Sequence, residues 1–116
     1  MYKDLKVYGR SYKLAVSLYK FSGTMPKEET YGLTSQIKRA ATSIPLNIAE
    51  GYGKGDTKAE LKRYLKMAKG SCNEMEVLLD LCKDLGFMQE YAHAKYVQEV
   101  QEIGAMLYGL MGSLDH

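Results

Sequence analysis

The sequence is poor in proline and contains no long uninterrupted apolar run. Only two prolines occur in 116 residues, and clusters of turn-forming residues appear at only a few places. An all-β chain needs many more turns, so this shortage excludes an all-β fold and favours helices. A membrane-spanning helix needs a run of ~18 apolar residues, and the absence of such a run predicts that the chain makes no membrane contact.

Cysteine is also scarce, and its two residues, Cys72 and Cys82, lie in one predicted helix. Ten residues of helix separate them by ~15 Å of rise, whereas a disulfide needs Cα atoms within about 7 Å of each other. We therefore expect reduced core cysteines, as in cytoplasmic proteins. The opening MYKDLKVYG carries charges where an export signal needs an apolar core, which also predicts a cytoplasmic location.

What is present fits a single globular domain over residues 1–116, with 46% hydrophobic and 26% charged residues. Apolar residues recur at helical spacing over residues 4–22, 30–51, 56–86 and 89–113. Four helices joined by short loops predict an all-α, antiparallel up-and-down four-helix bundle.

Capping residues and glycines set the expected helix boundaries. Asp4 and Asp56 are predicted N-caps, and Gly23 and Gly86 are predicted helix stops. The segment GYGKG, residues 51–55, is predicted to be the turn between the second and third helices.

Pro45 lies in the middle of the second predicted helix. A proline inside a helix removes one backbone hydrogen bond and presses on the carbonyl four residues earlier, here that of Ala41. The small side chains of Ala40 and Ala41 leave room for a bend. We therefore expect a kinked but continuous helix that ends near Gly51.

The first predicted helix carries apolar residues on two nearly opposite faces, although a helix with one core face needs only one apolar stripe. One of the two faces is expected to pack in the core and the other to meet another subunit. The alternative is a monomer whose core is thick enough to cover both faces. The almost uncharged stretch IGAMLYGLMGSL of the fourth helix also favours an oligomer. One face consists of Leu5, Tyr8, Tyr12, Ala15, Val16 and Tyr19, and the other of Val7, Leu14, Leu18 and Phe21.

A stripe of mixed polar side chains runs beside the apolar stripe of the second helix and is expected to meet polar residues of the third. If the chain turns at residues 51–55, Ser43 faces Arg63 and Asn47 faces Glu60. The favoured interpretation is a hydrogen-bonded layer that fixes helix register; a ligand groove is the alternative. This polar layer comprises Gln36, Arg39, Ser43, Asn47, Glu50, Glu60, Ser71 and Glu74.

Positive charge is concentrated in the middle of the chain. Between Thr34 and Gly70 eight basic residues face three acidic ones, a net charge of +5 against +2 for the whole chain. Cations repeated at steps of three and four along ~17 Å of helix suit a phosphate backbone. A solvated lysine face is the alternative. This basic ridge comprises Lys54, Lys58, Lys62, Arg63, Lys66 and Lys69.

Residues for catalysis or metal binding are sparse. Glu90 and His93 match the Glu-x-x-His spacing of di-iron bundles, but such sites need the motif on two helices, and the chain has only one other histidine, His116. No nucleophile has a base beside it. The sequence therefore predicts no enzyme activity, no metal and no cofactor.

The segment YGLTSQIKRAATSIPLNIAEGYGKGD, residues 31–56, followed by ELKRYLKMAKGSCNEMEVLL, resembles the signature of the 23S rRNA intervening sequence protein family. More distantly, the chain resembles the accessory variability determinant protein of diversity-generating retroelements. These resemblances imply a four-helix bundle that assembles as a homopentamer, without an established enzymatic role. The matching positions are Gln36, Arg39, Ser43, Pro45, Asn47, Glu50, Gly51, Glu60, Gly70, Ser71, Glu74 and Glu76.

These observations predict a non-catalytic oligomer that binds RNA or DNA through the basic ridge. The alternative is a protein scaffold or accessory subunit that makes no contact with nucleic acid. The expected partners are other copies of the chain, RNA or DNA, and another protein; the resemblance to the retroelement protein implies a reverse transcriptase in that place.

Overall fold

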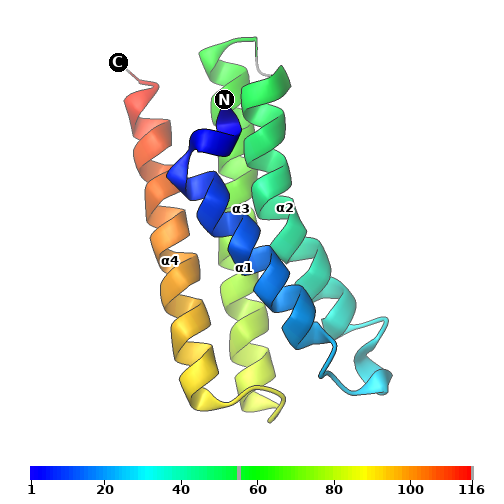
Figure 1. The fold of residues 1–116 in the computed structure, drawn as a ribbon. Helices are drawn as coiled ribbons and strands as arrows, with labels where there is room; N and C mark the ends of the chain where they lie inside the picture. Colours follow the sequence, from blue (N-terminus) through cyan, green and yellow to red (C-terminus); the bar gives the residue numbers. More distant parts are fainter. Residues whose placement is uncertain (55, 116) are drawn as a thin grey trace.

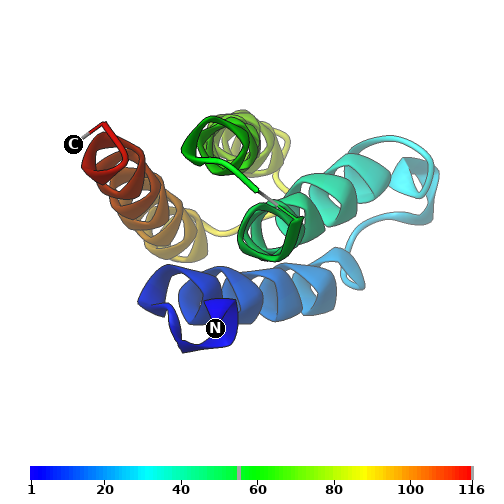
Figure 2. The same ribbon diagram turned by 90° about the horizontal axis from the view of Figure 1, so that it is seen from above.

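The computed structural model describes residues 1–54 and 56–115, and this part of the chain consists of helices joined by short loops, without a β-strand. Four α-helices are α1 (Lys6–Ser22), α2 (Leu33–Lys54), α3 (Lys58–Asp84) and α4 (Glu90–Ser113). Two short 3₁₀ helices, η1 (Tyr2–Asp4) and η2 (Lys27–Glu29), precede α1 and α2. Each helix runs opposite to the one before it, and the four surround a common core, as the predicted up-and-down bundle requires (Figures 1 and 2).

The core contains the apolar seams expected from helical spacing. Buried side chains come from all four helices and include Leu18 of α1, Ile44 of α2, Leu79 of α3 and Leu107 of α4. The bundle measures 45 × 24 × 20 Å, so its core is long and narrow. Residues three or four apart on each helix therefore face the same axis.

The two apolar faces of α1 differ in burial. Val7, Leu14 and Leu18 are buried in the core, whereas Tyr12 is 54% exposed and Tyr19 is 47% exposed. Which face points inward was open at the level of the sequence. The structure assigns the aliphatic face to the core and leaves much of the tyrosine face on the surface.

Two of the predicted caps are wrong. Asp4 belongs to η1, and the extended residue Leu5 precedes the first turn of α1 without a side-chain cap. Thr57, not Asp56, caps α3, because its side-chain oxygen accepts a hydrogen bond from the backbone N–H of Glu60. The predicted stop at Gly86 is confirmed by its φ of 82°, which favours glycine.

The turn between α2 and α3 begins later than predicted. Helix α2 continues through Pro45 and past Gly51 to Lys54, so Gly51–Lys54 are helical; Gly55 lies outside the described residues. As a result, Ser43 contacts Ser71, eight residues beyond the predicted Arg63. A longer α2 moves the pivot of the hairpin along the chain, and the facing positions of α3 move with it.

Candidate nucleic-acid interface and neighbouring polar contacts

The basic ridge lies at the end of α2 and along the first half of α3, at the upper end of the bundle in Figure 1. Its residues do not form one row of identical lysines. Some cations lie toward α4 and others toward the outer surface of α3, so the ridge is a broad face.

Lys62 and Lys69 occupy the side of the ridge that faces α4. The Lys62 ammonium lies 2.6 Å from the Asp115 carboxylate, and the Lys69 ammonium donates to the side-chain oxygen of Asn73 at 2.9 Å. The Lys69 side chain lies against the backbone of Gly104, where a Cβ atom would be 3.4 Å from it. Lys62 is therefore held by the segment after α4, and Lys69 is held by the next turn of α3 and by the surface of α4.

Arg63 and Lys66 occupy the outer side of the ridge. The Arg63 guanidinium lies 3.3 Å from the Glu60 carboxylate and 4.6 Å from the centre of the Tyr64 ring. Its hydrogen bond with Glu60 raises the pKa of Arg63, so the group stays charged. Lys62, Arg63 and Lys66 surround a shallow depression of about 280 Å³. The carboxylate partners of Lys62 and Arg63 lie on exposed side chains, so water and salt weaken both ion pairs.

The polar layer is brought together in part. The Ser43 and Ser71 hydroxyls are 2.7 Å apart, and the Asn47 amide donates to the Ser43 carbonyl at 2.8 Å. Arg39 donates to Gln36 at 2.7 Å and forms an ion pair with Glu74 across the helix pair. The Ser43–Ser71 and Arg39–Glu74 contacts join α2 to α3, which fits the role of fixing register.

The other two members of the predicted layer lie elsewhere. Glu60 pairs with Arg63 on the outer side of α3, and Glu50 is exposed near the end of α2. The predicted contact between Asn47 and Glu60 is therefore replaced by hydrogen bonds from Asn47 within its own helix. The later pivot of the hairpin explains both differences.

A charged cluster between α1 and α4 was not found from the sequence. Arg10 donates to both Glu99 oxygens, at 3.0 and 2.5 Å, and to Glu102 at 2.5 Å. These hydrogen bonds raise the pKa of Arg10 and hold the pKa of Glu102 below its ordinary value. The pair of glutamates three residues apart on one predicted helix face was the available signal, but the sequence does not say which cation they meet.

His93 has a structural partner. Its ring nitrogen Nε2 lies 2.7 Å from the Asp80 carboxylate, which connects α4 to α3. Within residues 1–54 and 56–115, no group of three histidine, cysteine or acidic residues is placed to hold a metal ion. His116, the second histidine weighed above, lies outside the described residues.

Both cysteines are buried and free. Burial raises the pKa of the Cys72 thiol to about 12 and that of Cys82 to about 11. At neutral pH both thiols are therefore protonated, and neither is an activated nucleophile.

Across the described helices, none is long and apolar enough to cross a membrane.

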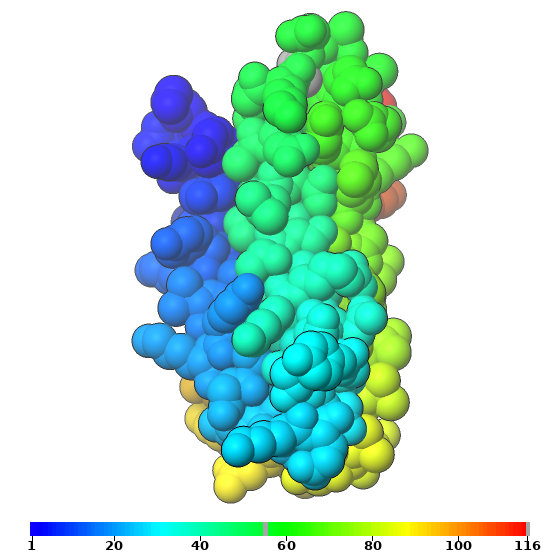
Figure 3. Space-filling model, turned by 90° about the vertical axis from the view of Figure 1, so that its right-hand side faces the viewer, coloured from blue at the N-terminus to red at the C-terminus, as the bar shows by residue number. Residues whose placement is uncertain are grey.

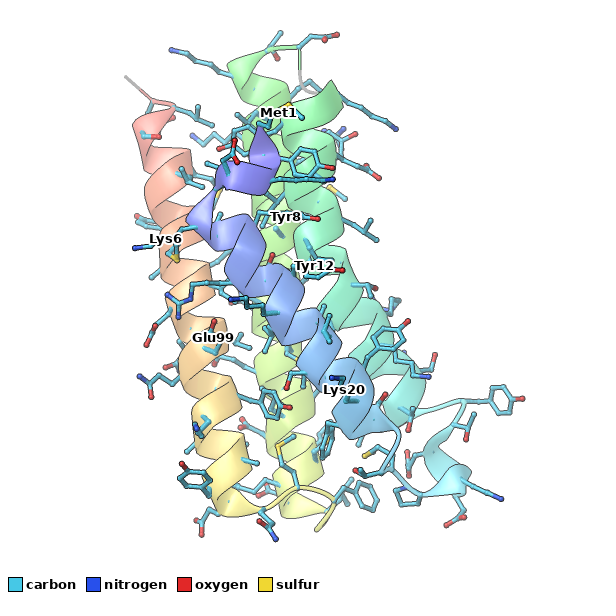
Figure 4. The ribbon with its side chains drawn as sticks, in the orientation of Figure 1. Met1, Lys6, Tyr8, Tyr12, Lys20 and Glu99 are labelled. Atoms are coloured by element: carbon cyan, nitrogen blue, oxygen red, sulfur yellow. The ribbon has the colours of Figure 1, made fainter. Side chains whose placement is uncertain are left out.

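The exposed tyrosines of α1 line a groove against α2. The groove has a volume of about 610 Å³ and is lined by Tyr8, Tyr12, Val16, Pro45 and Leu46, among others. Figure 3 shows the face where α1 and α2 meet, and Figure 4 shows Tyr8 and Tyr12 on the side of α1 next to α2. Most of the side chains that line this groove are apolar or aromatic, and Lys20 adds a charge.

Comparison with known proteins gives a family and a fold. A family profile described as 23S rRNA-intervening sequence protein matches residues 3–109. A crystal structure from Bacteroides thetaiotaomicron, described as a protein with unknown function from the S23 ribosomal protein family, is similar with a TM-score of 0.84. It shares 23% sequence identity, and the match covers 91% of this chain and 95% of that one. No curated protein sequence matches the chain.

Proposed function

Because this chain belongs to the 23S rRNA-intervening sequence protein family, we propose that it is a non-catalytic, oligomeric helical-bundle protein that binds RNA or DNA through the basic ridge. The observation that carries this proposal is the depression surrounded by Lys62, Arg63 and Lys66. Three cations converge there from two successive turns of α3, on the surface of the bundle.

The physical basis of binding is the exchange of weak contacts for phosphate contacts. The partners of Lys62 and Arg63 are carboxylates on exposed side chains, which water and salt already screen. A polyanion that meets several of these cations at once releases its condensed counterions, and this release drives association. The ~17 Å from Lys58 to Lys69 allows contacts with several successive phosphates.

Charge reversal of Lys58, Lys62 and Lys66 to glutamate is expected to weaken binding of a labelled, structured RNA at least about tenfold, because each reversal removes a phosphate contact. The slope of log affinity against log salt should fall by about three. Fluorescence anisotropy titrations between about 50 and 200 mM salt measure both quantities. A DNA duplex of matching sequence, titrated in parallel, distinguishes RNA from DNA as the preferred ligand.

The matched control reverses Lys3, Lys27 and Lys83 to glutamate, which changes net charge equally but lies outside the ridge. It should retain most of the affinity. If both triple variants lost the same amount of RNA affinity, binding would depend on the net charge of the chain and not on the position of the basic ridge. Wild-type affinity that is insensitive to salt would overturn the electrostatic proposal altogether.

The proposed oligomer is a homopentamer in which the tyrosine face of α1 meets a neighbouring copy. The groove between α1 and α2, where Tyr12 and Leu46 expose more than half of their surface, supports a contact between subunits. The number of five copies is what the resemblance described above implies. Pro45 lines the same groove. A bend of α2 at this proline is part of the proposal, because a missing hydrogen bond allows the helix axis to tilt there.

Light scattering at micromolar concentration tests the assembly. We expect a mass about five times the 13.1 kDa of one chain, and a smaller species when Tyr12 and Leu46 are both replaced by glutamate, because charge in an apolar interface is costly. Replacing Tyr31, which is 98% exposed before α2, by glutamate is the matched control and should leave the mass unchanged. A wild-type species of one chain at this concentration would refute the oligomer.

The second candidate function is a protein scaffold or accessory subunit whose partner is a different protein, such as a reverse transcriptase. The same groove favours this function, since it offers a mostly apolar docking surface in which Lys20 is the charged lining residue. Copurification with and without nuclease separates the two candidates. A partner that is lost after nuclease treatment is bridged by nucleic acid, and a partner that is retained contacts the protein directly.

A further inference from the structure

A second cleft opens between α1 and α4, at the end of the bundle opposite to the basic ridge. The two helices approach each other where Arg10 binds Glu99 and Glu102, and they diverge toward the end of α1 (Figure 1). Figure 4 places Glu99 on α4 at the level of this approach. Below it lies a cleft of about 490 Å³.

Ammonium groups line this cleft from both walls, and aromatic rings line it from α4. Lys13 and Ser17 come from α1, and Tyr91, Lys95 and Tyr96 come from the first turns of α4. The Tyr96 hydroxyl lies 2.6 Å from the Ser17 hydroxyl, so Tyr96 is held in place. Tyr91, by contrast, is 73% exposed.

The Tyr91 ring has the Lys95 ammonium over one of its faces. The Lys95 ammonium lies 5.2 Å from the centre of the ring, a cation–π contact that covers one face. Because the residue as a whole is largely exposed, ring surface outside this contact is open to solvent. A planar aromatic ligand that stacks there would have a positive charge within reach of its substituents.

The charges around the cleft favour an anion. Glu99 is the acidic residue of the lining, and Arg10 binds both of its oxygens. Arg10 also forms an ion pair with Glu102, so the cluster of one arginine and two glutamates carries a net charge of −1. Lys13 and Lys95 outweigh it, and the cleft as a whole is positive by one charge.

We propose that this cleft binds one nucleotide unit of an unpaired nucleic-acid strand, with the base stacked on Tyr91 and a phosphate between Lys13 and Lys95. The proposal rests on the nucleic-acid binding proposed above and adds a site for single strands at the far end of the bundle. A stacked base is recognised by its ring face, so this site accepts any base sequence. The basic ridge, which offers cations along a helix, instead follows a phosphate backbone.

The test is anisotropy of a labelled, unstructured eight-nucleotide RNA. Replacing Tyr91 by alanine should weaken binding about tenfold, because one stacking contact is lost, whereas Tyr91→Phe retains the ring and should bind as wild type does. Tyr31→Ala is the matched control, since it removes an exposed tyrosine elsewhere. The double variant Lys13→Gln with Lys95→Gln should lower the salt slope by about one to two.

The outcomes test the cleft separately from the basic ridge. Equal affinities of the Tyr91→Ala and Tyr31→Ala variants would overturn the cleft, and so would a wild-type protein that binds structured RNA but not the short strand; both leave the basic ridge intact. Binding of inorganic phosphate without binding of a mononucleotide or nucleoside would overturn the stacking role of Tyr91. A wild-type protein that binds none of these nucleic acids would overturn both proposals together.

Discussion

Replacing Ile44 by alanine is expected to lower the free energy of unfolding by about 2–5 kcal/mol. Ile44 is completely buried in the middle of α2, and truncation both removes apolar contact area and leaves a cavity among the surrounding helices. A loss of this size lowers the melting temperature by roughly 8 °C or more in a domain of about this length. Urea denaturation followed by circular dichroism measures it.

Leu46 provides the matched control, since it lies two residues further along the same helix and is 57% exposed. Leu46→Ala should cost less than about 1 kcal/mol in the folded monomer, because an exposed side chain leaves no cavity. If Leu46 contributes to the proposed subunit contact, its effect should grow with protein concentration, whereas that of Ile44 should not. Equal costs at both positions under dilute conditions would contradict the orientation of α2.

Replacing Gly51 by alanine is expected to cost about 1–3 kcal/mol, although alanine is the better helix former. A Cβ atom at this position would lie 2.9 Å from the Tyr64 Cβ and 3.0 Å from a Leu61 methyl carbon. Both neighbours belong to α3, and Tyr64 Cβ is attached directly to its backbone. The two helices must therefore separate slightly to accept the extra atom.

Gly53 offers the comparison within the same helical turn, because a Cβ atom there would have no neighbour within 4 Å. Gly53→Ala should leave stability unchanged or raise it by up to about 1 kcal/mol. Denaturation of the two variants side by side isolates close packing from helix propensity. A neutral result at both glycines would mean that α2 and α3 are not in close contact at Gly51.

The two proposed nucleic-acid surfaces lie at opposite ends of a bundle that is 45 Å long. The basic ridge follows the turn between α2 and α3, whereas the cleft lies at the start of α4. In the proposed oligomer each surface is repeated around the assembly. Weak contacts at each copy then add through their effective concentration, which offsets the modest charge of a single chain.

Gly51 illustrates why part of the candidate site was misplaced from the sequence. The three glycines of GYGKG predict a turn, yet Gly51 and Gly53 are helical, and Gly55 lies outside the described residues. Glycine is common in turns because of its backbone freedom. At Gly51 it is required for another reason: α2 lies so close to α3 that there is no room for a Cβ atom. Because the pivot was placed too early, Ser43 was paired with Arg63 when it contacts Ser71.

The sequence by itself determined the four α-helices, the residues of their core seams and the family, because each depends on spacing along one chain segment. The two short 3₁₀ helices were not predicted. Only the tertiary structure decided which face of α1 is buried, where α2 ends, and which partners Arg10 and Lys62 take. The apolar period of a helix repeats every three to four residues whether one face or two are covered. The choice between faces, and between charged partners 53 or more residues apart, depends on which helices lie beside each other, and no local pattern contains that information.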